Sequence, residues 1–144
     1  MTTIIDPTAV LGPGLQLGEF VVIEAGATLG AGVTLGHHVV VHAGTVIGDG
    51  AWVGDQAVLG RAPRPAPTSA VKTPPNLPPL QIGRESIIGA GAVVYSGTTV
   101  GEQTMIGDHA FVRDRCQIGS YVIVGSHVTI ENEVTIGDYT KLQT

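Results

Sequence analysis

Five histidines carry the most useful chemistry in this sequence, because imidazole is the side chain that gains and loses a proton near neutral pH. His42 stands eighteen residues after Glu24, and His127 stands eighteen residues after His109. A carboxylate that orients an imidazole and raises its basicity is the arrangement of a general base. Two neighbouring imidazoles could share a water or place a base in a cleft. Both interpretations require that residues eighteen apart in the sequence lie next to one another in space.

A six-residue rhythm of branched aliphatic residues predicts such an arrangement. It runs without a slip from Ile5 to Leu59 and from Ile82 to Leu142, and Gly follows the aliphatic residue at fourteen of twenty-one positions. A period of six fits neither a helix nor a lone alternating strand. It is typical of a solenoid whose short strands each point an aliphatic residue inward and then turn at a glycine-rich corner.

Three such sides make a triangular coil of eighteen residues, so residues eighteen apart stack directly, about 4.8 Å apart. The second inward slot of each side lies beside the corner and holds small or branched residues, including Cys116. We therefore expect Cys116 to be buried as packing, and a single cysteine excludes an internal disulfide. The same stacking predicts ion pairs along one corner, Arg113 with Glu131 and Arg115 with Glu133.

One proline-rich segment interrupts the rhythm and holds seven of the nine prolines, with 17 residues inserted between Leu59 and Ile82. Proline denies ladder hydrogen bonds and favours an extended, semi-rigid excursion. The segment is either a tolerated surface insertion or an arm that reaches a neighbouring subunit and walls a cleft. The predicted boundaries are one domain at 1–144, with coils at 3–60 and 80–144 and the inserted loop at 61–79.

Composition excludes several classes of protein. The chain is 43% hydrophobic but only 4% aromatic, which suits a narrow aliphatic core. A net charge of -5 with seven Lys and Arg residues gives no basic face for nucleic acid. The first residues lack the features of a signal peptide, and glycines and polar corners interrupt every apolar run that could span a membrane. We expect a soluble, cytoplasmic protein.

The repeat of an aliphatic residue, a small or acidic residue and, three positions later, another small residue resembles that of the hexapeptide-repeat transferases. This resemblance covers nearly the whole chain and implies an all-β fold, a left-handed parallel β-helix. It also implies a homotrimer that transfers an acyl group from a thioester donor, acetyl-CoA or an acyl carrier protein. No bound cofactor and no metal are expected.

A closer similarity starts at Ile82, where IGRESIIGAGAVVYSGT aligns without a gap to the UDP-N-acetylglucosamine acyltransferase family of lipid A synthesis. The catalytic histidine of that family falls on Tyr95, and its following histidines fall on Phe111 and Asp114. A phenol with a pKa near 10 is a poor general base. An amine acceptor carries its own nucleophilic lone pair, so we predict N-acylation of a nucleotide-linked sugar. The candidate catalytic residues, in order, are His109, His127, His42 and Tyr95.

Two other classes remain open. The segment GHHVVVHAG, with His37 and His42, resembles the histidine pair of γ-class carbonic anhydrases, but no third histidine precedes it to complete a zinc site. A catalytically silent structural or binding solenoid is the second alternative. The rhythm still runs at Thr144, which predicts either a chain truncated at its C-terminus or one that stacks end to end.

Overall fold

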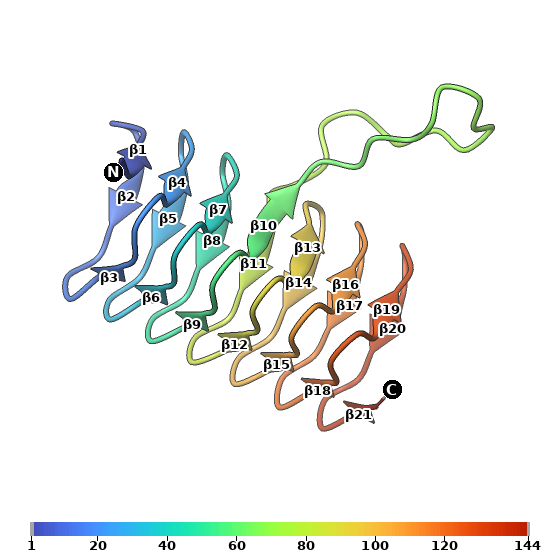
Figure 1. Ribbon diagram of the computed structural model, residues 1–144. Helices are drawn as coiled ribbons and strands as arrows, with labels where there is room; N and C mark the ends of the chain where they lie inside the picture. Colours follow the sequence, from blue (N-terminus) through green and yellow to red (C-terminus); the bar gives the residue numbers. More distant parts are fainter. Residues whose placement is uncertain (1, 144) are drawn as a thin grey trace.

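The computed structural model describes residues 2–143, and this part of the chain forms short β-strands joined by turns and one long loop (Figure 1). The strands build three parallel seven-stranded sheets, which are the three faces of a triangular solenoid. The predicted fold class, a left-handed parallel β-helix of eighteen-residue coils with one extruded proline-rich loop, is confirmed.

Each face takes every third strand of the chain. The first sheet contains β1 (Ile4–Ile5), β4 (Val22–Ile23), β7 (Val40–Val41), β10 (Val58–Arg61), β13 (Val93–Tyr95), β16 (Phe111–Val112) and β19 (Thr129–Ile130). The second sheet contains β2 (Val10–Leu11), β5 (Thr28–Leu29), β8 (Val46–Ile47), β11 (Gln81–Ile82), β14 (Thr99–Val100), β17 (Gln117–Ile118) and β20 (Thr135–Ile136). The third sheet contains β3 (Gln16–Leu17), β6 (Thr34–Leu35), β9 (Trp52–Val53), β12 (Ile87–Ile88), β15 (Met105–Ile106), β18 (Ile123–Val124) and β21 (Lys141–Leu142).

Three corners join these faces, and each is named here by its position. The loop corner lies between the first and second sheets, the second corner between the second and third, and the third corner between the third and first. Representative turns are residues 24–27 and 42–45 at the loop corner, 48–51 and 83–86 at the second corner, and 36–39 and 107–110 at the third corner.

The register of the strands continues across the proline-rich loop. Val41 pairs with Leu59, and Leu59 then pairs with Val94 on the far side of the insertion. On the second sheet Ile47 pairs with Ile82 in the same way. The coil therefore resumes in phase, as the 17-residue count predicts, and the loop projects away from the solenoid (Figure 1).

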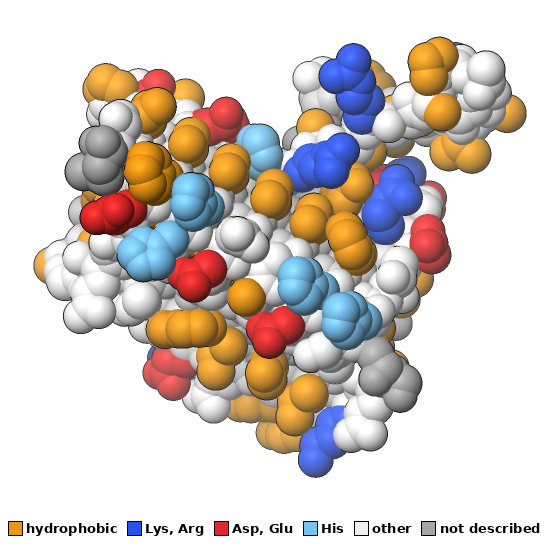
Figure 2. Space-filling model, viewed as in Figure 1, with side chains coloured by type: hydrophobic (Ala, Val, Ile, Leu, Met, Phe, Trp, Pro, Cys, Tyr) orange, Lys and Arg blue, Asp and Glu red, His pale blue; other side chains and the backbone are white. Residues whose placement is uncertain are grey.

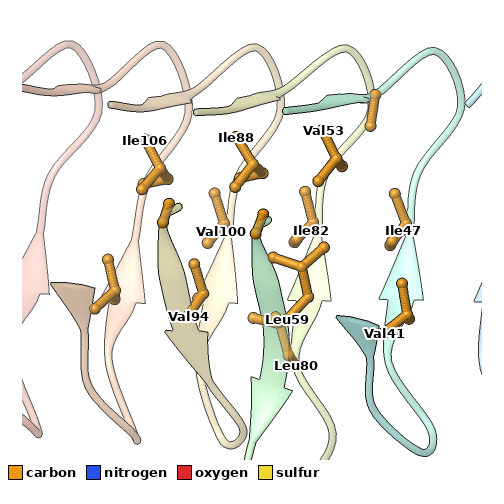
Figure 3. Packing of buried hydrophobic residues seen from close by; sticks show 14 of the residues in the cluster. Val41, Ile47, Val53, Leu59, Leu80, Ile82, Ile88, Val94, Val100 and Ile106 are labelled. Carbon is orange, nitrogen blue, oxygen red and sulfur yellow. The ribbon is translucent and has the colours of Figure 1, made fainter. Parts of the chain in front are cut away.

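The aliphatic residues of the rhythm form the core. Leu59, Ile88 and Ile106 are fully buried, and Figure 3 shows the inward side chains of successive coils packed against one another. Each such column stabilises the fold, because burial of apolar surface contributes about 25 cal/mol of free energy per Å². Leu80 is also buried at the point where the chain returns from the loop, so a larger residue fills the small slot there.

Small polar residues in the second inward slot satisfy the backbone of the corners. The buried hydroxyls of Ser86, Thr98 and Thr104 donate hydrogen bonds of 2.7–2.9 Å to carbonyl oxygens one coil away. Cys116 is buried, as predicted, and its Sγ donates to the carbonyl oxygen of Glu131 at 3.1 Å. Burial raises the pKa of this thiol, so Cys116 is a protonated packing residue at neutral pH.

Candidate active site at the loop corner

The proline-rich loop and the loop corner line an open cavity of about 850 Å³. The corner contributes Glu24, His42 and Ser96, and the loop contributes Lys72 and Asn76 together with prolines and Leu77. The loop therefore lines a cleft of its own chain, and its reach to a neighbouring subunit stays a prediction. Prolines suit this wall because they hold an extended backbone without ladder partners.

His42 and Glu24 face each other at the edge of this cavity. The Nδ1 atom of His42 lies 2.9 Å from Oε1 of Glu24, and the same oxygen accepts the backbone N–H of Ala43 at 3.1 Å. The two side chains are partly buried, with 32% and 43% of their surface exposed. Because Glu24 occupies the Nδ1 side of the ring, Nε2 is the nitrogen left for a ligand. The predicted dyad is thus present as a hydrogen-bonded pair.

Tyr95 lies farther along the same corner and is flanked by two arginines. The guanidinium carbon of Arg113 is 4.9 Å from the centroid of the Tyr95 ring, and that of Arg61 is 5.6 Å away. Arg61 is the residue that pairs with Tyr95 across the loop, at a register shift in β10. A guanidinium over an aromatic face is a favourable cation–π arrangement.

The predicted ion pairs of this corner form only in part. Arg115 reaches Glu133 at 3.1 Å, as the stacking predicts, and its Nε also donates to the buried carboxylate of Asp114 at 2.7 Å. Arg113 makes no ion pair with Glu131 in residues 2–143; it lies over Tyr95 and approaches Asp114 at 3.7 Å. Arg113 therefore contacts the ring of Tyr95 and the buried carboxylate of Asp114 in place of Glu131.

His109 and His127 stack on the third corner, as their spacing predicts. Their ring centroids are 5.5 Å apart and the rings are inclined by 14°. Both residues are exposed and have left-handed backbones, with φ of 56° and 62°. The His109 ring lies over Gly91, where an added Cβ would come within 2.6 Å of it. These histidines are therefore on a different corner of the coil from His42 and Tyr95.

His37 also lies on the third corner, where it has a structural role that the sequence did not reveal. Its Nδ1 accepts the backbone N–H of Glu19 at 2.9 Å, and its own N–H donates to Asp55 at 2.8 Å. Asp49 and Asp108 accept backbone N–H groups of the preceding coil in the same way. His37, Asp49, Asp55 and Asp108, which each follow a corner glycine, thus cap the backbone of the preceding coil.

The described residues also bear on metal binding and membrane insertion. In residues 2–143 no group of three His, Cys, Asp or Glu side chains is placed to hold a metal ion. His37 and His42, the pair that resembles a carbonic anhydrase, lie on different corners. The described part of the chain also contains no helix long and apolar enough to cross a membrane.

Comparison with known proteins agrees with this architecture. The bacterial transferase hexapeptide family (six repeats) matches residues 79–114. No curated protein sequence matches the chain at a significant level. The predicted resemblance to the hexapeptide-repeat transferases is confirmed by this match and by the solved structures described next.

Three solved structures illustrate the similarity. A UDP-N-acetylglucosamine acyltransferase superposes with a TM-score of 0.87 at 28% identity, over 96% of this chain and 54% of its own. LpxA from Acinetobacter baumannii gives 0.67 at 25% identity, over 98% of this chain and 65% of its own. A variant of perosamine N-acetyltransferase from Caulobacter crescentus, in complex with CoA and GDP-perosamine, gives 0.74 at 21% identity, over 90% and 52%.

The coverage and the sequence identity of these matches limit what each one shows. The chain spans about half to two thirds of the length of these enzymes. The perosamine enzyme, at 21% identity, documents the fold alone. The neighbours are nucleotide-sugar acyltransferases, and the family resemblance extends over the coils that carry Tyr95 and the residues around it.

Proposed function

We propose that this chain is an acyltransferase that moves an acyl group from a thioester donor to the amino group of a nucleotide-linked sugar. The single observation that carries the proposal is the hydrogen-bonded His42–Glu24 pair beside a cavity on a hexapeptide solenoid. The similarity to a UDP-N-acetylglucosamine acyltransferase supports the reaction class. Acetyl-CoA or an acyl carrier protein is the proposed donor, and neither has to remain bound after turnover.

His42 is the proposed general base, and Glu24 is its orienting partner. Nε2 takes a proton from the amine as its nitrogen attacks the thioester carbonyl. The C–N bond forms, the C–S bond breaks, and the proton passes from Nε2 to the departing thiolate. Glu24 stabilises the imidazolium that exists between these two transfers, because its carboxylate already contacts Nδ1.

An amine acceptor is compatible with the tyrosine that this chain has at position 95, where the family has its catalytic histidine. A hydroxyl acceptor requires a base that activates it strongly, whereas an amine needs only to lose its proton. A phenol in the position of the family histidine is therefore less damaging to N-acylation than to O-acylation. His109 and His127 remain the alternative bases, and they require a neighbouring copy that brings its own loop corner to them.

A homotrimer is the proposed assembly. The outward residues flanking the third corner are apolar: Trp52, Ile87, Met105 and Ile123 on the third sheet and Phe111 on the first are 39–49% exposed. On the second sheet the outward residues are polar from β11 onward, with Gln81, Gln117 and Thr135 exposed and Thr99 half-buried, whereas Val10 and Val46 are exposed nearer the N-terminus. Figure 2 shows histidines between two bands of hydrophobic side chains. Unlike faces that meet head to tail form a ring of copies when the rotation between copies closes.

A donor–acceptor screen tests the proposal directly. Purified protein is incubated with acetyl-CoA and a panel of amino-sugar nucleotides, and release of free thiol is measured beside the mass of the sugar product. Acetylation of at least one amino sugar, with the corresponding hydroxyl sugar inert, is the expected result. No product with any acceptor, together with no acetyl-CoA binding by calorimetry, would identify a silent solenoid. Stoichiometric zinc in the purified protein would favour the carbonic anhydrase alternative.

A further inference from the structure

One residue from each coil after the first forms a column along the loop-corner edge of the first sheet. In spatial order the column contains Glu24, His42, Arg61, Tyr95, Arg113 and Glu131. Each residue follows the inward aliphatic of its strand, except that the register shift in β10 places Arg61, one position later, beside Tyr95. The column therefore continues from the His42–Glu24 pair into a stretch of two guanidiniums and a phenol.

The two guanidiniums of this stretch lack full partners. In residues 2–143 Arg61 has no carboxylate within ion-pair distance, and Arg113 reaches only Asp114, at 3.7 Å. The Nε atom of Arg113 is buried and has no hydrogen-bond partner in this part of the chain. Arg115 differs, because Asp114 and Glu133 both contact it at 3.1 Å or less. Arg61 and Arg113 are thus the cations of this corner with charge left for a ligand.

The surrounding charge is also unusual for an acidic chain. The net charge is -5 and the chain has seven Lys and Arg residues. Five of the seven lie on the loop or its corner: Arg61, Arg64, Lys72, Arg113 and Arg115. Figure 2 shows most of the basic side chains of this view gathered at the base of the projecting loop and along it. Cations concentrated on one site raise the local concentration of an anionic ligand.

We infer that Arg61 and Arg113 bind the two phosphoryl groups of a diphosphate ester, with the Tyr95 ring as the spacer between them. The two arginines stand two coils apart, about 10 Å by strand spacing. Each guanidinium can donate two parallel hydrogen bonds to one phosphoryl group, which lysine cannot do. The Tyr95 ring lies beside both guanidiniums and holds the two forks apart. Tyr95 thus acts as a spacer in this site, and not as a general base, for which a phenol is poorly suited.

Two substrates of the proposed reaction carry a diphosphate, the sugar nucleotide and coenzyme A. The position of His42 favours the sugar nucleotide, and this choice rests on the proposed function. Arg61 lies on the coil next to that of His42, one residue beyond Gly60, which stacks on His42. In a sugar nucleotide the sugar is attached directly to the diphosphate, so an amino group on it reaches the base. In coenzyme A a long arm separates the diphosphate from the thioester.

Binding experiments without turnover test the inference. Calorimetry measures the Kd of inorganic pyrophosphate, UDP, GDP and CoA for the wild-type chain and for Arg61→Gln and Arg113→Gln. We expect each substitution to weaken pyrophosphate and nucleoside diphosphate binding about 10- to 100-fold, the usual effect of losing hydrogen bonds to a charged group. Arg84→Gln is the matched control, since Arg84 already pairs with Glu102 at 2.9 Å on the second corner.

Two variants of Tyr95 separate spacing from hydroxyl chemistry. Tyr95→Phe retains the ring and is expected to keep the nucleoside diphosphate affinity within about twofold, whereas Tyr95→Leu lowers it because the cation–π contacts are lost. Arg61 is an exposed residue, so Arg61→Gln reports on binding even where Arg113→Gln unfolds the chain.

The outcomes distinguish the ligand source from the site itself. Weakened UDP or GDP binding with unchanged CoA binding supports a sugar-nucleotide site. Weakened CoA binding alone supports a diphosphate site that serves the donor. Unchanged affinity for every probe in both arginine variants overturns the inference. A chain that acetylates nothing in the donor–acceptor screen but binds UDP through these arginines leaves it standing.

Discussion

At the scale of single residues, His42 combines a fixed orientation with access to a cavity. Its Nδ1 contact with Glu24 and the Ala43 N–H contact of the same carboxylate oxygen hold the pair in one geometry. His109 and His127 have the same chemistry but stack on each other at an exposed corner. The two sites have the same side chain and differ in what surrounds it. His42 has a carboxylate partner and a cavity, whereas His109 and His127 have each other and solvent.

The first prediction concerns the base. His42→Gln should lower kcat for acyl transfer by about 10²- to 10⁴-fold, the usual contribution of a general base. Glu24→Gln should lower it less, since the imidazole remains. Initial rates at saturating donor measure both, and thermal unfolding confirms that the variants fold. Full turnover in His42→Gln with loss in His109→Asn would move the base to the third corner.

The second prediction concerns the corner caps. Asp55 accepts the backbone N–H of His37 at 2.8 Å, and Asp55→Ala should lower the free energy of unfolding by about 0.5–2 kcal/mol, as other lost capping bonds do. Asp55→Asn keeps an acceptor oxygen and should retain most of that stability. Denaturant titration compares the two. Equal stability of Asp55→Ala and the wild-type chain would show that the cap contributes nothing.

At the scale of elements, the two-residue strands are stable only as members of columns. Ile106 and Met105 are neighbours on β15, yet the first is fully buried and the second is 41% exposed. Ile106→Asp should unfold the chain, since an unpaired charge among aliphatic residues costs several kcal/mol. Met105→Asp is the matched control and should keep the β-helix. Circular dichroism and thermal unfolding measure both, and a cooperative wild-type-like transition in Ile106→Asp would contradict the packing.

The elements also show where sequence reasoning succeeds. The eighteen-residue spacing predicted correctly that His42 meets Glu24 and that His127 meets His109, because strand register fixes which residues stack. It did not predict the partner that each long side chain chooses. Arg113 turns to Tyr95 instead of Glu131, and Arg61 joins them only through the register shift at the start of the loop. The path of the loop was equally beyond prediction, because prolines leave no ladder hydrogen bonds to define it.

At the scale of the whole molecule, the proposed homotrimer depends on the apolar side chains that flank the third corner. We predict a trimer in light scattering for the wild-type chain and a shift toward monomer for Met105→Asp, which places a charge in the apolar band of the third sheet. Thr99→Asp introduces the same charge among the outward polar residues in the C-terminal half of the second sheet and should remain trimeric. A monomeric wild-type chain, or equal masses for the two variants, would remove the proposed contact surface.

The last prediction concerns the loop. Deleting residues 62–78 removes 17 residues, so Leu59 and Ile82 regain the six-residue spacing of the rhythm while buried Leu80 stays in place. The β-helix should fold with an unchanged circular dichroism spectrum. Ligand binding should weaken because one wall of the cavity, including Lys72 and Asn76, is lost. Unchanged affinity by calorimetry would mean that the ligand binds elsewhere.

The in-phase return of the chain after the loop has a consequence for how such proteins diversify. The excursion leaves the loop corner after β10 and comes back to the second sheet at β11, in register with the coil below. Its length is therefore not tied to the eighteen-residue period that every other segment must obey. Selection can lengthen, shorten or recompose the loop while each buried column keeps its neighbours. The lining of the cavity and the stability of the fold can thereby change independently on one chain.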